Sequence, residues 1–265
     1  MSLPYTPLEG LYILAAVSSL LVVVIILSYL RKLDIGKEFT YAMIKGGSQL
    51  ALIAVILTIL FQLETWYFYI WILLGAMILI AGYTSAKRAT HMPKAYQVTT
   101  PAILTGATIA LTVLAITRAM PLQPQFIIPL SGMAFGNAMA ICSLSMERVI
   151  REVRLNRAAI ESMLSLGATS QQALEPYTRI SVRAALIPTI DSLKTLGFIF
   201  IPGAMSGLLI AGTDPLLAAE YQIIVYLMIV GGGIISTLVA TTLSRKKLFT
   251  TYDQLAEWTL HSDKI

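Results

Sequence analysis

Residues 10–30 read GLYILAAVSSLLVVVIILSYL, a run of 21 residues without a charge. A transmembrane helix needs about 20 apolar residues to cross about 30 Å of hydrocarbon, so this run predicts a membrane-spanning helix. Further uncharged runs of 18 to 28 residues follow along the chain. We therefore expect an all-α polytopic membrane protein with about seven transmembrane helices, at approximately 10–30, 46–63, 65–86, 96–117, 124–146, 186–212 and 220–244.

The composition supports this fold class and excludes several functions. Hydrophobic residues make up 57% of the 265 residues and charged residues only 12%, against about 25% charged in an ordinary soluble domain. The single cysteine, Cys142, excludes a disulfide framework and a cysteine zinc cluster. The chain contains no phosphate-binding loop, no dinucleotide fingerprint and no H-E-x-x-H motif. We therefore expect no enzyme and no cofactor bound by this chain, and any ATP and Mg²⁺ must be bound by a partner.

The basic residues predict the orientation in the membrane. Lys and Arg gather after the first, third, fifth and seventh uncharged runs, whereas the loops between hold only Arg118. Because basic residues are retained on the cytoplasmic side, we expect the N-terminus outside and the C-terminus in the cytoplasm. This one-sided distribution of the formal charge of +5 favours membrane lipids as a partner and not nucleic acid.

The longest polar segment, residues 147–183, separates the fifth and sixth predicted spans within what we expect to be one permease domain over residues 1–265. Within it, ESMLSLGATSQQAL at 161–174 predicts a helix, a turn at Gly167 and a second helix capped by Thr169 or Ser170. The exposed apolar residues of such a short helix favour docking of a soluble partner. A solvated helix that only touches lipid headgroups is the alternative.

Polar and helix-breaking residues inside the predicted spans are the candidates for translocation or gating. Asp191 and Lys194 lie three residues apart on one helix face, as a self-neutralising pair or as part of a pathway. Pro202 and Gly203 predict a kink or break in the sixth span. No recognisable metal cluster is present, so the metal ligands stay unknown. The full set of candidates is Gln49, Asn137, Asp191, Lys194, Pro202, Gly203, Met205, Glu220 and Gln222.

Three segments resemble a known family: SGMAFGNAMA at 131–140, ESMLSLGATSQQAL at 161–174 and IDSLKTLGFIFIPGAMSGLLIAGTDPLLAAEYQI at 190–223. They are similar to the iron-export ABC permeases of the FetB (YbbM) type, which are related to plant aluminium-tolerance membrane subunits. The resemblance covers nearly the whole chain. Residues 161–167 also resemble the E-A-A-x-x-x-G loop of ABC importer permeases, with Ser162 and Met163 in place of the two alanines.

The resemblance implies a homodimer of this chain working with two ABC ATPase subunits in a bacterial inner membrane. It places a coupling helix, held in a groove of the ATPase, at Glu161, Leu166, Gly167, Ala168 and Thr169. It also implies ATP-driven export of iron or a related metal species. Alternatives are an ABC permease for another metal, an oxyanion or a nucleotide sugar, an importer, an ion-gradient-driven transporter without an ATPase that uses Asp191, Lys194 and Glu220, or a membrane scaffold.

Overall fold

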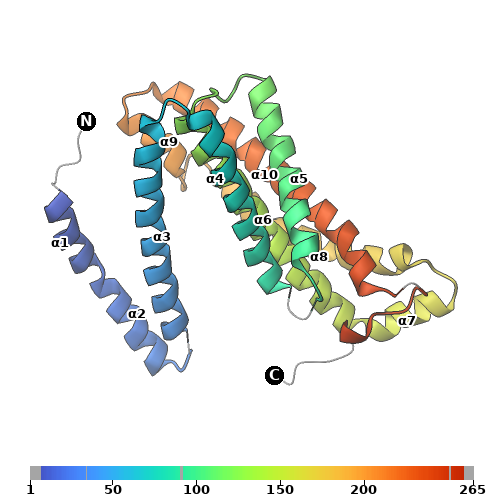
Figure 1. Cartoon of the computed structure of the whole chain (residues 1–265). Helices are drawn as coiled ribbons and strands as arrows, with labels where there is room; N and C mark the ends of the chain where they lie inside the picture. The colour runs from blue at the N-terminus through green and yellow to red at the C-terminus, as the bar shows by residue number, and fades with distance from the viewer. Residues whose placement is uncertain (1–6, 34, 90–91, 251, 260–265) are drawn as a thin grey trace. The chain divides into compact units, whose positions relative to one another are not determined.

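The computed structural model describes residues 7–33, 35–89, 92–250 and 252–259, and they fold into two compact units, residues 1–66 and 67–265. Both units are helical (Figure 1). The first unit is a hairpin of two apolar rods. One rod consists of α1 (Pro7–Val17) and α2 (Ser19–Leu30), and the other is α3 (Gly36–Gln62). The Ser28 Oγ accepts a hydrogen bond of 3.0 Å from the Gly36 N–H, which ties the turn to the end of α2.

The second unit contains α4 to α10 (Figure 1). Short helices, α7 and α9, lie at its two ends, and α8 connects them. The buried interior lies among the long helices α4, α5, α6 and α10. The bounds are α4 (Trp66–Arg88), α5 (Tyr96–Ile116), α6 (Pro124–Leu155), α7 (Arg157–Ser165), α8 (Ser170–Lys194), α9 (Gly203–Ile210) and α10 (Pro215–Leu248), followed by a 3₁₀ turn at Glu257–Thr259.

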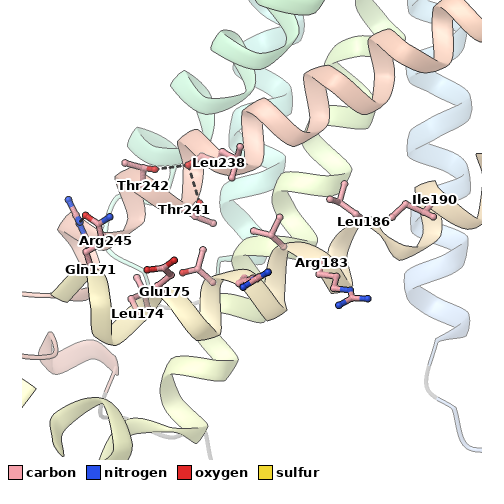
Figure 2. A pocket seen from close by; sticks show the side chains of 13 residues that line it. Gln171, Leu174, Glu175, Arg183, Leu186, Ile190, Leu238, Thr241, Thr242 and Arg245 are labelled. Atoms are coloured by element: carbon pink, nitrogen blue, oxygen red, sulfur yellow. Dashed lines mark hydrogen bonds between the residues drawn. The ribbon is translucent and has the colours of Figure 1, made fainter. Parts of the chain in front are cut away.

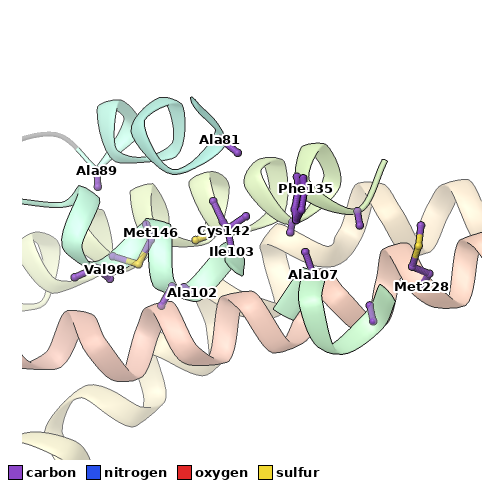
Figure 3. Packing of buried hydrophobic residues seen from close by; sticks show 14 of the residues in the cluster. Ala81, Ala89, Val98, Ala102, Ile103, Ala107, Phe135, Cys142, Met146 and Met228 are labelled. Carbon is purple, nitrogen blue, oxygen red and sulfur yellow. The ribbon is translucent and has the colours of Figure 1, made fainter. Parts of the chain in front are cut away.

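Small residues allow the helices of the second unit to approach closely (Figure 3). A Cβ atom at Gly106 of α5 would overlap Ser236 and the Gly232 carbonyl of α10, so the two backbones touch there. The Thr99 hydroxyl of α5 donates a hydrogen bond of 2.7 Å to the Gly82 carbonyl of α4. Membrane helices associate through such contacts because lipid tails are as apolar as the side chains and supply no hydrophobic driving force.

Six helical segments in the described part of the chain are long and apolar enough to cross a membrane: Glu9–Leu30, Gly36–Gln62, Trp66–Arg88, Tyr96–Ile116, Pro124–Leu155 and Pro215–Leu248. They confirm the first five predicted spans and the seventh as apolar helices. The predicted bounds are too short at two places. Helix α3 begins at Gly36 and not near residue 46, and α6 continues to Leu155.

The sixth predicted span, residues 186–212, is not one continuous helix. Helix α8 ends at Lys194, residues 195–202 are not helical, and α9 begins at Gly203. Helix α8 starts at Ser170, within the segment predicted to be cytoplasmic, and it contains Arg179 and Arg183, which keep its hydropathy low. The seven-span count, the orientation of the termini and the single permease domain stay predictions.

Candidate functional site

The candidate coupling segment, residues 157–169, follows α6 with almost no interruption. Asn156 alone separates α6 from α7. Its backbone N–H donates to the Glu152 carbonyl at 3.0 Å, and its side-chain amide donates to the same carbonyl at 2.9 Å. The Ile160 N–H donates to the Asn156 carbonyl at 3.0 Å, so the hydrogen-bond ladder resumes at once. Helix α7 is therefore fixed to the end of a membrane helix by a single bent residue.

The end of α7 is a Schellman turn, as the sequence around Gly167 predicts. Gly167 has φ +91°, a left-handed conformation that favours glycine. The Ala168 N–H donates to the Met163 carbonyl and the Gly167 N–H donates to the Leu164 carbonyl, each at 3.0 Å. These two bonds satisfy carbonyls that the helix end leaves without a partner.

Helix α8 begins with a capping box at Thr169, which decides between the two predicted caps. The Gln172 N–H donates to the Thr169 hydroxyl at 3.3 Å, and the Thr169 N–H donates to the Gln172 Oε1 at 2.9 Å. Such reciprocal bonds satisfy two of the free N–H groups of a helix start. The turn between α7 and α8 is thus defined by backbone geometry on both sides.

One face of α7 is anchored in a small apolar core. Ile160 is fully buried, and its surroundings include Val153 of α6, Leu174 of α8 and Leu248 of α10. Phe249 and Leu255 of the C-terminal segment, residues 249–259, complete the same core. Because four parts of the chain share this core, α7 cannot shift without moving α6, α8 or α10.

The opposite face of the coupling segment is open to solvent. The side chain of Leu166, at the turn, is 88% exposed. Arg157 Nε lies 2.7 Å from Glu161 Oε1, in an exposed ion pair that orients Glu161 and contributes little to stability. Beside this pair is a hollow of about 580 Å³, lined by Glu161 and Ala168 on one side and by residues 252–255 on the other. A partner could enter this surface without displacing any buried side chain.

The second candidate region is the break between α8 and α9. Gly197 has φ +86° and its N–H donates to the Phe200 carbonyl at 3.0 Å, which closes a loop where the helix stops. Pro202 precedes α9 and offers no side-chain acceptor for its first N–H groups. Gln222 of α10 supplies one, because its Oε1 accepts a hydrogen bond of 3.1 Å from the Met205 N–H.

The structure brings some of the predicted translocation residues together and leaves others apart. Met205 and Gln222 are hydrogen-bonded, and Lys194 Nζ lies 3.1 Å from Asp191 Oδ1 with both side chains exposed. The pair thus forms within one helix. The Asn137 amide donates to the Met133 carbonyl of its own helix at 2.9 Å. Exposed side chains at Gln49 of α3 and Glu220 of α10 have no printed polar contact that joins them to these groups.

The hard-oxygen groups near the break are used for capping. The Asp214 carboxylate accepts hydrogen bonds from the Leu216 and Leu217 N–H groups at 2.9 and 3.3 Å and so caps α10. No three His, Cys, Asp or Glu side chains converge within the described ranges.

Two features of the second unit were not singled out from the sequence. One is the C-terminal segment, where the Trp258 Nε1 donates to the Lys247 carbonyl at 2.9 Å and folds the chain back beside α7. The apolar residues Leu255 and Trp258 were its only signal. The other is a groove between α8 and α10, lined by Arg179, Arg183 and Arg245 among others (Figure 2). Its arginines are far apart in sequence and carry no recognisable motif.

Long apolar helices joined by basic, folded connections define a multi-pass membrane protein of the plasma membrane. The chain belongs to the UPF0014 family, an uncharacterised protein family whose model matches residues 11–249. This membership agrees with the family resemblance found in the sequence.

Relatives come from plants and bacteria. The rice "UPF0014 membrane protein STAR2" is 34% identical over 258 residues, covering 97% of this chain and 90% of the relative. The Arabidopsis thaliana "Protein ALUMINUM SENSITIVE 3" is 33% identical over 258 residues, 97% of this chain and 93% of the relative. The Escherichia coli "Probable iron export permease protein FetB" is 35% identical over 242 residues, 91% of this chain and 93% of the relative. No solved structure matches the chain.

Proposed function

We propose that this chain is the membrane-spanning permease subunit of an ABC transporter that exports iron or a related metal species. In this proposal two copies of the chain form a homodimer, and two separate ATPase subunits bind ATP and Mg²⁺. The name of the Escherichia coli relative, at 35% identity, supports the permease role and the iron substrate. The direction follows the same relative.

The observation that carries the proposal is the construction of α7 and its turn. The turn presents Leu166 and Glu161 to solvent, while Ile160 anchors the same helix among α6, α8 and α10. A soluble partner that moves α7 would therefore displace membrane helices directly. Such an element can bias a dimer between inward-open and outward-open states that differ by a few kcal/mol, which is within the differential binding energy of a partner.

The break between α8 and α9 is the proposed place where the membrane part yields. Residues 195–202 lack helical hydrogen bonds, and α9 depends on Gln222 of another helix for its cap. Pro202, Gly203 and Met205 would then move with α9, and Asp191 and Lys194 lie at the other side of the break. Gln49, Asn137 and Glu220 remain candidates for the pathway in the dimer.

The test uses Leu166→Glu, because Leu166 is 88% exposed and contributes little to the fold. The tagged chain is purified from its own membrane, and captured ATP-binding subunits are identified by mass and by ATP hydrolysis. The wild type is expected to retain an ATPase that Leu166→Glu loses. Leu155→Glu is the matched control, since Leu155 is 73% exposed on α6 and lies before the coupling segment.

Transport is measured in inside-out membrane vesicles supplied with iron. The proposal expects uptake that requires ATP, persists with a protonophore and falls in Leu166→Glu but not in Leu155→Glu. Uptake that a protonophore abolishes and that proceeds without ATP would instead establish an ion-gradient-driven transporter. ATPase capture without iron uptake would retain the permease role and reject the substrate.

A further inference from the structure

A groove of about 680 Å³ lies between the first half of α8 and the last turns of α10 (Figure 2). Its polar end is held by one bond between the helices, from Arg245 Nη1 to Gln171 Oε1 at 2.6 Å. The groove opens beside the basic end of α10, which carries Arg245, Lys246 and Lys247. On the orientation that the basic residues predict, this is the level of the cytoplasmic headgroups.

The polar end of the groove carries unbalanced positive charge. Arg179, Arg183 and Arg245 line it, and Glu175 is the only acidic residue among its lining side chains. Neither Arg179 nor Arg183 has an acidic side chain within 4.0 Å among the residues that the structure describes. Cationic side chains at the edge of a membrane domain are usually paired or in contact with anionic headgroups.

The other end of the groove is apolar. Leu186 and Ile190 of α8 face Leu238 of α10 along this part of the groove (Figure 2). The hydroxyls of Thr241 and Thr242 donate to the Leu238 carbonyl at 3.0 and 2.8 Å, so they are satisfied by their own helix. The groove therefore changes from cationic to apolar along its length, as a lipid changes from headgroup to acyl chain.

We propose that this groove binds an anionic glycerophospholipid, with its phosphate against Arg179 and Arg183 and an acyl chain along Leu186 and Ile190. Arginine suits phosphate because its planar guanidinium donates two parallel hydrogen bonds. A free phosphate would use only the cationic end, and a zwitterionic lipid would bring a second positive charge to it. The site is independent of ATP-driven transport and of iron.

The test is lipid binding by the full chain purified in a neutral detergent. The probes are dioctanoyl phosphatidylglycerol, dioctanoyl phosphatidylcholine and inorganic phosphate, and the readouts are the unfolding midpoint and native mass spectrometry. Phosphatidylglycerol is expected to raise the midpoint of the wild type well above the effect of phosphatidylcholine. In Arg179→Gln/Arg183→Gln the apparent dissociation constant for phosphatidylglycerol is expected to rise about tenfold or more, because two charge-assisted contacts are lost.

The matched control is Arg88→Gln/Arg151→Gln, which removes the same charge from exposed arginines outside the groove and should bind phosphatidylglycerol as the wild type does. Arg179→Lys/Arg183→Lys keeps the charge and should retain much of the binding, which separates lost binding from lost folding. Equal shifts with both lipids, or undiminished binding in the double glutamine variant, would overturn the proposal. A phosphate effect equal to that of phosphatidylglycerol would reassign the groove to a free anion.

Discussion

At the scale of single residues, Gln222 contributes to the fold through one hydrogen bond at the membrane helix break. Its side chain is 3% exposed and caps α9 through the Met205 N–H. Gln222→Leu keeps similar volume and removes the acceptor, so we expect a loss of about 1–3 kcal/mol in unfolding free energy. In a chain of this size each kcal/mol lowers the Tm by about 2–4 °C, which a thermal unfolding scan in detergent measures.

Gln49→Leu is the control for this substitution. Gln49 is exposed on α3, and its replacement by leucine should leave the unfolding midpoint unchanged or raise it slightly. If Gln222→Leu unfolds at the same temperature as the wild type, the cap of α9 does not contribute to stability, and Gln222 would return to the list of pathway candidates.

A second residue-scale prediction concerns Gly167, whose φ of +91° places it in the left-handed region. A Cβ there meets no neighbouring atom, so only backbone conformation penalises a substitution. We expect stability to fall in the order Gly167→Asn, Gly167→Ala, Gly167→Val, with the alanine variant losing about 1–2 kcal/mol. Thermal unfolding checks the order.

Gly207→Ala is the comparison for Gly167, because Gly207 lies inside α9 with open space at its Cβ position. An alanine in a helix interior should be neutral or stabilising by about 1 kcal/mol. Equal losses for the asparagine and valine variants of Gly167 would mean that the left-handed turn is not what requires glycine.

The residue-scale comparison shows what a sequence can indicate about polar groups in an apolar chain. The glycine turn and the Thr169 cap could be predicted because each depends on neighbours within a few residues. Asp214 and Gln222 were assigned to possible ligands or a pathway, whereas the structure uses both as caps. The role of Gln222 depends on a helix that begins 19 residues earlier, at Gly203, and no local pattern carries that information.

At the scale of elements, the contact between α5 and α10 depends on Gly106. Even one methyl group there would overlap backbone atoms of α10, which cannot move aside as a flexible side chain can. We expect Gly106→Ala to destabilise the protein by about 1–3 kcal/mol, as overpacked cores do. Size-exclusion chromatography and thermal unfolding of the purified variant provide the measurement.

Gly231→Ala controls for the change from glycine to alanine in a membrane helix. Gly231 belongs to α10, one residue before Gly232, yet its Cβ position is open. The control should therefore keep the wild-type profile. If both variants behave alike, backbone contact at Gly106 does not hold α5 against α10.

Most elements follow from charge-free length, since burying a backbone in lipid requires a helix. The sixth predicted span shows where this reasoning stops. Its residues are apolar enough, but Gly197 and Pro202 favour a loop closed by its own hydrogen bonds, and α8 draws its first half from the polar segment. The groove between α8 and α10 could not be predicted at all, because it depends on the register between two helices.

At the scale of the whole molecule, the prediction concerns whether α8 and α9 together cross the membrane. Cys142 is the only cysteine in the sequence and is buried, so Cys142→Ser gives a clean background for labelling. We expect a membrane-impermeant maleimide to label Thr213→Cys from outside intact cells. Leu166→Cys should be labelled only in inside-out vesicles.

The same labelling distinguishes the two topologies. If α8 and α9 turn back within the membrane, residues 166 and 213 lie on the same side, and both cysteines would be labelled from the cytoplasm. Glu64→Cys is the control, because the loop between α3 and α4 is expected outside in either case.

The chain also carries its own optical reporter. Trp258 is held against the Lys247 carbonyl in the core that anchors α7, whereas the other two tryptophans, Trp66 and Trp71, belong to the start of α4. With Trp66 and Trp71 replaced by phenylalanine, emission from the indole at 258 would report on this junction alone. Its wavelength depends on how dry the ring is, so movement of α7 during a working cycle would be visible without any attached dye.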